Sequence, residues 1–235
     1  MTLTADNLSP RCRRGLVLFG VGLLLAACSY GDYEKGEGDN SLLRADFGEM
    51  YTEADNSVKT LETDDGYRIT LEKPYTAQWL SKPDTLYRAL LYYKLPANEA
   101  PQIVSAVQVP TVSPHPTIFF HDTIITHPVG FESAWMSRNC RYLNLGLLVK
   151  TGSLTDDRQL EKQQFSIVRD TLRLNPDSTR TLCLRLYHDQ ANQPEYYTQD
   201  FFLSVRTSPS QADSVSITIN TYDGQVQKTL PIKVI

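Results

Sequence analysis

Apolar and polar residues alternate along most of the chain after residue 40, and this period of two is typical of β-strands with one buried face. Val58–Thr63 and Tyr67–Leu71 alternate on either side of Asp64-Asp65-Gly66, which predicts a hairpin. Further alternating strands are predicted over 42–52, 88–95 and 103–109. We therefore expect an all-β protein that begins with a five-stranded barrel of the OB type.

Prolines cluster after this first group of strands and predict a stiff, extended boundary near residue 112. They are Pro96, Pro101, Pro110, Pro114 and Pro116. Seven more alternating strands follow, over 131–136, 141–150, 163–170, 179–188, 199–207, 214–221 and 226–234. This spacing is typical of an Ig-like β-sandwich. We predict an OB-type barrel domain over 41–112 and a seven-stranded sandwich domain over 113–235.

The N-terminal segment has a different pattern. Arg11, Arg13 and Arg14 precede an uncharged apolar run, Gly15 to Ala27, which is shorter than the roughly 20 residues that a membrane-spanning helix needs. This arrangement predicts a secretory signal over 1–27. Leu25-Ala26-Ala27-Cys28 resembles a bacterial lipobox, in which the cleaved chain begins with a lipidated cysteine. Several acyl chains on Cys28 would hold the protein firmly on a lipid bilayer.

Residues 28–40 combine glycines with Asp32, Glu34, Glu37 and Asp39, and this composition predicts a solvated tether. Acidic residues soon after a lipidated cysteine also resemble the surface-export signal of Bacteroidetes lipoproteins. We therefore expect an outer-membrane lipoprotein that faces the cell surface, with a periplasm-facing protein as the alternative. The net charge of −4 becomes more negative when the arginines of the signal are removed.

Four segments resemble one known family: "YRITLEKPYTAQW", "CRYLNLGLLVKTG", "TLCLRLYHDQANQPEYYTQDFFLSV" and "SITINTYDG". They are similar to segments of the NigD-like lipoproteins of Bacteroidetes, which pair an N-terminal OB domain with a C-terminal β-sandwich behind a lipobox. The resemblance spans 41–235 and is strongest from Tyr142 to Gly224. It implies the same fold, and it suggests bacteriocin immunity as a role. It supplies no catalytic motif.

No residue pattern singles out a reaction. The histidines, His115, His121, His127 and His188, lie outside any metalloprotease or zinc-finger spacing. His121-Asp122 and His188-Asp189 are poor catalytic pairs, because adjacent residues of a strand point to opposite faces. We therefore expect structural or solvent-exposed histidines and no metal or other cofactor. A pair of glycosidase carboxylates has no sequence signature that would reveal it.

Cys140 and Cys183 are the cysteines that fall in the predicted sandwich. Outside the cytoplasm a disulfide between them is permitted. Alternation places both on strand faces away from the leucines, which is compatible with a bridge. Two reduced, half-buried thiols are the alternative.

Aromatic residues are frequent in the predicted barrel, and OB barrels commonly bind oligonucleotides or oligosaccharides on one face. Tyr67, Trp79 and Tyr92 are the candidate ligand face. Acidic residues outnumber basic ones from 41 to 110, so nucleic acid is excluded as a partner, because a phosphate backbone needs a basic surface. The same aromatics could instead fill the barrel and its rim.

Five Asp-Ser/Thr triplets with an apolar residue or threonine in third place resemble the O-glycosylation sequon of exported Bacteroidetes proteins. Their hydroxyls belong to Thr85, Thr123, Thr171, Ser178 and Ser214. We expect four of the five at strand ends. The structural alternative is that aspartate favours turns and a β-branched residue then begins or ends a strand.

These patterns favour a non-enzymatic, membrane-anchored surface module that binds a protein or a glycan, with bacteriocin immunity as one form of that role. The alternative is a surface enzyme that hydrolyses glycan or peptide, which would need convergent carboxylates or histidines.

Overall fold

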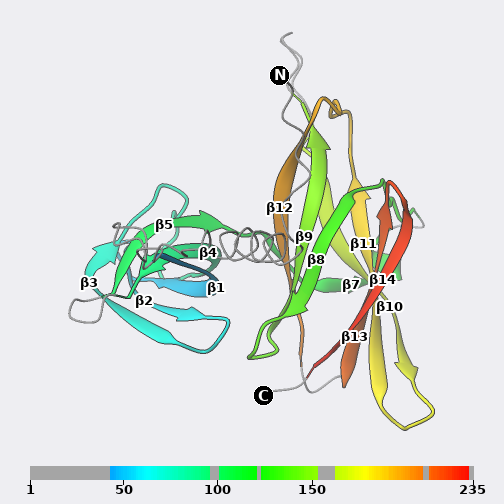
Figure 1. The fold of residues 1–235 in the computed structure, drawn as a ribbon, viewed down its shortest axis with the longest axis horizontal. Coiled ribbons are helices and arrows are strands. Elements are labelled where there is room, and N and C mark those ends of the chain that lie inside the picture. The colour runs from blue at the N-terminus through cyan, green and yellow to red at the C-terminus, as the bar shows by residue number, and fades with distance from the viewer. Residues whose placement is uncertain (1–42, 96–100, 121–122, 153–161, 209–211, 233–235) are drawn as a thin grey trace, which may run out of the picture. The chain divides into compact units, whose positions relative to one another are not determined.

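The structure is a computed structural model that describes residues 43–95, 101–120, 123–152, 162–208 and 212–232. Within these ranges the chain forms fourteen β-strands and one short 3-10 helix, η1 (Thr117–Phe120) (Figure 1). The predicted all-β fold is confirmed. The predicted signal (1–27), the lipidation site Cys28 and the tether (28–40) lie outside the described residues. No helix in the described part of the chain is long and apolar enough to cross a membrane.

The first five strands form one antiparallel sheet, here called the N-terminal sheet, in the order β3-β2-β1-β4-β5. Its strands are β1 (Leu43–Thr52), β2 (Val58–Thr63), β3 (Arg68–Tyr75), β4 (Leu86–Lys94) and β5 (Gln102–Gln108). The predicted turn joins β2 to β3. Gly66 has a φ of 83°, which glycine adopts without steric cost, and its N–H donates to the Thr63 carbonyl at 2.9 Å. The sheet forms a half-barrel, as the OB-type prediction requires.

All seven long strands predicted for the sandwich are present. They are β8 (Gly130–Met136), β9 (Tyr142–Thr151), β10 (Gln164–Leu174), β11 (Arg180–Asp189), β12 (Tyr197–Arg206), β13 (Ser214–Thr221) and β14 (Gly224–Pro231). One sheet has the order β14-β13-β11-β10-β7 and the other β6-β12-β9-β8.

Each part of the chain has its own hydrophobic core. In the N-terminal sheet, Met50, Leu91 and Tyr93 are at most 2% exposed. In the sandwich, the alternating leucines of β9 and β11 are buried between the two sheets, together with residues of β13. Leu143, Leu145 and Leu147 are 0% exposed. Since burying such a side chain contributes about 1.5–3 kcal/mol, these inward faces supply most of the stability of each part.

The proline-rich segment predicted as a boundary contributes two short strands to the sandwich. β6 (Thr111–Val112) pairs in parallel with β12, and β7 (Pro114–Pro116) pairs in parallel with β10. The chain therefore crosses from one sheet to the other at Ser113. Each short strand lies at a sheet edge, where proline is tolerated because no outward N–H is needed.

The prediction that both cysteine side chains point away from the leucine core of the sandwich is wrong for Cys140. Cys140 precedes β9 in a turn, is 1% exposed and packs in the sandwich core, where its Sγ lies 3.6 Å from the Arg138 carbonyl. Cys183 is half-buried on the outer face of β11, and its Sγ lies 3.8 Å from the Thr181 carbonyl. The structure does not join the two sulfurs, because one side chain points into the core and the other away from it.

Candidate functional site

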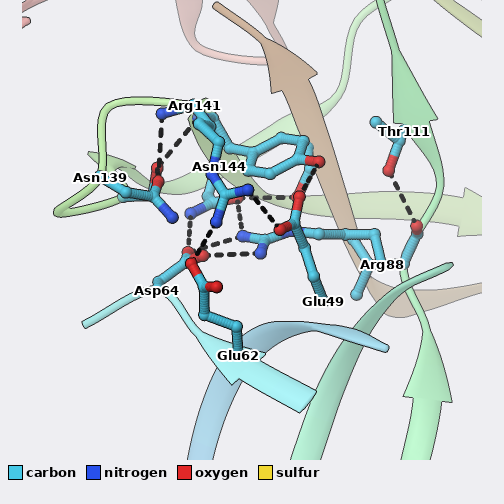
Figure 2. A network of polar contacts seen from close by, with 12 residues as sticks. Glu49, Glu62, Asp64, Arg88, Thr111, Asn139, Arg141 and Asn144 are labelled. Carbon is cyan, nitrogen blue, oxygen red and sulfur yellow. Dashed lines mark hydrogen bonds and ion pairs between the residues drawn. The ribbon is translucent and has the colours of Figure 1, made fainter. Parts of the chain in front are cut away.

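A buried arginine links the N-terminal sheet to the sandwich. Arg88 on β4 is 5% exposed, and its Nη1 and Nη2 donate to the two carboxylate oxygens of Asp64, each at 2.6 Å. Nη2 also donates to Asn144 Oδ1 at 3.1 Å, and Nε donates to Ser204 Oγ at 3.1 Å. Figure 2 shows Arg88 of β4, Asn144 of β9 and Asp64 of the β2–β3 turn converging. Bidentate pairing to carboxylate is the geometry that suits a guanidinium best.

Strand alternation explains why polar residues lie here. Asn144 on β9 and Ser204 on β12 face away from the leucine core of the sandwich, yet both are 0% exposed. They are buried because they meet Arg88 of the N-terminal sheet. Asn144 accepts from Ser204 Oγ at 2.7 Å and donates to Asp64 at 3.0 Å, so its amide is hydrogen-bonded on both sides.

A second set of ion pairs surrounds Glu49 on β1. The hydroxyl of Tyr142 donates to Glu49 Oε1 at 2.6 Å, and Arg141 Nη1 lies 2.7 Å from Oε2. Arg141 also pairs with Glu62 (Figure 2). Burial raises the pKa of Tyr142 to about 12, and the hydrogen bond to Glu49 and the negative charge of Glu49 contribute to the same rise. These residues, with Asp64, Arg88, Asn144 and Ser204, are here called the junction network.

Aromatic rings pack beside the network. Phe47 on β1 lies edge-on to Trp135 and to Phe202, with ring centroids 5.2 and 5.4 Å apart. The Arg88 guanidinium lies 4.2 Å from the centroid of the Tyr142 ring. Such a desolvated cation–π contact contributes about 2 kcal/mol. The junction therefore combines polar contacts with apolar packing.

Two grooves flank the junction network. The first, here called the apolar groove, has a volume of about 370 Å³. Its lining includes Leu90, Tyr92 and Val107 from the N-terminal sheet and Phe201 and Phe202 from β12. The second, here called the cationic groove, has a volume of about 390 Å³. It is lined by residues that include Trp79, Lys82, Tyr87, Arg88, Tyr142 and Arg206.

The three aromatic residues predicted as a ligand face separate in the structure. Tyr92 lines the apolar groove, and Trp79 lines the cationic groove, where it packs edge-on to Tyr87 at 5.7 Å. Tyr67 is 60% exposed next to the β2–β3 turn and belongs to neither groove. The prediction thus found one residue of each groove but missed the sandwich residues that complete them.

The described histidines pack against aromatic rings or take part in hydrogen bonds of the fold. His188 is 1% exposed, stacks on Phe165 at 4.6 Å and contacts the His127 carbonyl through Nδ1 at 2.9 Å. Burial lowers the pKa of His188, although the hydrogen bond with the His127 backbone opposes that change. Asp189, the next residue of β11, instead accepts from the Ala191 N–H at 2.8 Å. His115 stacks on Phe119, and His121 lies outside the described residues. Among the described residues, no three metal-ligating side chains converge.

The predicted O-glycosylation hydroxyls differ in exposure. Thr123, Thr171 and Ser178 are exposed, whereas Thr85 and Ser214 are half-buried and hydrogen-bonded. Thr171 lies inside β10 and not at a strand end, because β10 continues past the predicted stop at Asp170.

Several of the triplet aspartates have structural contacts. Asp177 accepts from the Thr179 N–H at 3.0 Å, Asp213 accepts from the Arg180 N–H at 2.7 Å, and Asp170 pairs with Arg185. The preference of aspartate for turns next to strands therefore accounts for much of the triplet pattern.

The chain is similar in fold to several solved structures. One is a NigD-like immunity protein from Bacteroides caccae, with a TM-score of 0.56 and 24% identity over 79% of this chain and 91% of that one. Another is a protein of unknown function from Bacteroides vulgatus, with a TM-score of 0.61 and 14% identity over 81% and 91%. A third is a proposed lipoprotein from Bacteroides fragilis, with a TM-score of 0.54 and 14% identity over 81% and 98%. No family model and no curated protein matches the chain.

The resemblance predicted from the sequence is thus confirmed at the level of the fold. This chain shares the architecture of a solved NigD-like immunity protein, and the likeness carries no residue roles with it.

Proposed function

We propose that this chain is a non-catalytic binding protein of the bacterial cell envelope that engages a protein or a glycan at the junction surface. Acyl chains on Cys28 anchor it in the outer membrane, and the acidic tether presents it at the cell surface. The lipobox supports the anchor, and the shared fold with a proposed lipoprotein from Bacteroides fragilis is consistent with it.

One observation carries this proposal: the carboxylates of the junction network are already paired with neighbouring side chains. Asp64 is bound by Arg88, and Glu49 is bound by Arg141 and Tyr142. A general acid or base needs a carboxylate that can exchange its proton with a substrate, whereas these carboxylates hold two parts of the fold together. What remains accessible beside them is two grooves lined by aromatic residues, which favours binding over hydrolysis.

A protein partner is favoured by the fold shared with a NigD-like immunity protein. In that form of the proposal, the partner is a bacteriocin, and the chain protects the cell that displays it. The apolar groove suits a protein partner, because Tyr92 and Phe202 are rings of the type that dominate protein interfaces.

Capture from intact cells tests this function. The full chain and its Tyr92→Asp variant are crosslinked to their surroundings in the native bacterium and recovered, and the bound molecules are compared by mass spectrometry. A charge in the apolar groove should abolish capture of the specific partner. Leu172→Asp is the matched control, because Leu172 is an exposed apolar residue on β10. Equal recovery by Tyr92→Asp and Leu172→Asp would contradict a ligand at the junction.

A further inference from the structure

The cationic groove carries positive charge, which is unusual in a chain with more acidic than basic residues. Three cationic side chains line it, from Lys82, Arg88 and Arg206, and its lining contains no carboxylate. Arg88 is neutralised by Asp64, but no carboxylate of the described residues forms an ion pair with Lys82 or Arg206. Within the described part of this acidic chain, two cations therefore lie in one concave site without a carboxylate partner.

The Tyr87 hydroxyl in the same groove accepts a backbone hydrogen bond. The N–H of Lys82 donates to the Tyr87 hydroxyl oxygen at 3.0 Å. Burial alone would raise the pKa of Tyr87, but hydrogen bonds with Ser81 and Lys82 and the Lys82 charge lower it below its ordinary value. The surroundings of the Tyr87 oxygen thus favour its negative form, which agrees with the positive charge of Lys82 and Arg206 in the same groove.

Aromatic rings form part of the wall. Trp79 is half-buried and packs edge-on to Tyr87. On the other side, Tyr142 is fixed by its hydrogen bond to Glu49. A tryptophan or tyrosine presents an apolar body beside a polar edge, and cyclic ligands with both apolar faces and hydroxyl groups match such walls.

We propose that the cationic groove binds an acidic saccharide, whose carboxylate or sulfate group lies between Lys82 and Arg206 and whose ring packs near Trp79. This inference rests on the proposed binding function and names one class of ligand for it. Arg206 supplies a planar guanidinium that can bind a carboxylate or sulfate with two hydrogen bonds, and Lys82 adds a compact charge. Nucleic acid does not fit, since it requires cations along an extended track and this site offers two.

Titration calorimetry on the full-length protein tests the proposal with trigalacturonate as the acidic probe and maltotriose as the neutral probe of equal length. Trigalacturonate should bind at least tenfold more tightly than maltotriose. Lys82→Gln and Arg206→Gln should each weaken its binding by tenfold or more. Lys228→Gln on β14 is the matched control for Lys82→Gln and should leave binding unchanged. Thermal unfolding confirms that each variant is folded.

Several outcomes would overturn the proposal. They are no binding of trigalacturonate at millimolar concentration, equal binding of maltotriose, or unchanged binding by Arg206→Gln. Inorganic sulfate that binds as tightly as trigalacturonate would show a site for a simple anion and remove the saccharide. These results concern the cationic groove alone. If a partner were still captured through Tyr92 in the apolar groove, the proposed function would hold and only the acidic saccharide would be ruled out.

Discussion

At the scale of single residues, the stability of the fold depends on the hydrogen-bond and ion-pair partners of Arg88. A buried guanidinium is costly to remove from water, and only close partners repay that cost. Asp64, Asn144 and Ser204 provide them, and the Tyr142 ring covers one face. Removal of either charge therefore leaves the other one buried and unpaired.

Arg88→Met should lower the free energy of unfolding by about 3–5 kcal/mol, because it leaves Asp64 without its partner. The double variant Arg88→Met, Asp64→Leu should recover a large part of that loss. Urea denaturation followed by circular dichroism measures both. Arg185→Met is the matched control, because its pair with Asp170 is 37% and 29% exposed and should contribute about 1 kcal/mol or less. Similar losses at Arg88 and Arg185 would refute the buried network.

Tyr142→Phe should reduce stability by about 1–3 kcal/mol at neutral pH, because Glu49 loses a donor. The folded pKa of Tyr142, about 12, lies above the ordinary value of 10. Unfolded chains therefore lose this proton first, and the contribution of Tyr142 is complete below pH 10 and disappears as the pH rises toward 12.

Urea titrations at a series of alkaline pH values should show the difference between wild type and Tyr142→Phe shrinking over that interval. The exposed Tyr67→Phe is the control and should change stability by no more than about 0.5 kcal/mol. A constant difference across the interval would mean that Tyr142 does not titrate as its burial implies.

If the Asp-Ser/Thr triplets are glycosylated in the native host, their exposure predicts where. Peptide mass spectrometry should find sugar on Thr123, Thr171 and Ser178, because their hydroxyls are accessible. Thr85 and Ser214 should carry no sugar, since each residue is half-buried and its hydroxyl forms a hydrogen bond. Sugar confined to Thr85 and Ser214, or absent from every triplet, would contradict this prediction.

At the scale of strands, alternation was enough to predict almost every long element. The period of two in β9, β11 and β13 arises from local burial, and local burial is visible in a sequence. The strand roles of Thr111–Val112 and Pro114–Pro116 were not visible, because segments this short show no period and become strands only through their partners β12 and β10.

The junction was hidden for a similar reason. Asn144 and Ser204 look like ordinary outward polar residues of a sandwich strand, and nothing in their neighbourhood along the chain shows that Arg88 covers them. The only available signal was a polar residue between leucines in β9, which is too common to indicate an interface. Cys140 was misplaced because it lies in a turn, where the parity of the following strand does not hold.

At the scale of the whole molecule, the described residues present two unlike grooves beside the junction network. The apolar groove and the cationic groove each take residues from both parts of the fold. Binding in either groove, as proposed, would therefore depend on the contacts that join the N-terminal sheet to the sandwich. A protein anchored through Cys28 would hold this surface away from the membrane on its acidic tether.

Site-specific photo-crosslinking in the native bacterium tests the central claim most directly. A photoreactive phenylalanine analogue replaces Tyr92 in the apolar groove, and in a second strain it replaces Tyr222, which is 39% exposed in the β13–β14 turn. We expect one discrete crosslinked species from position 92 and none of the same mass from position 222. Identical products from both positions, or no product from position 92, would contradict a ligand surface at the junction.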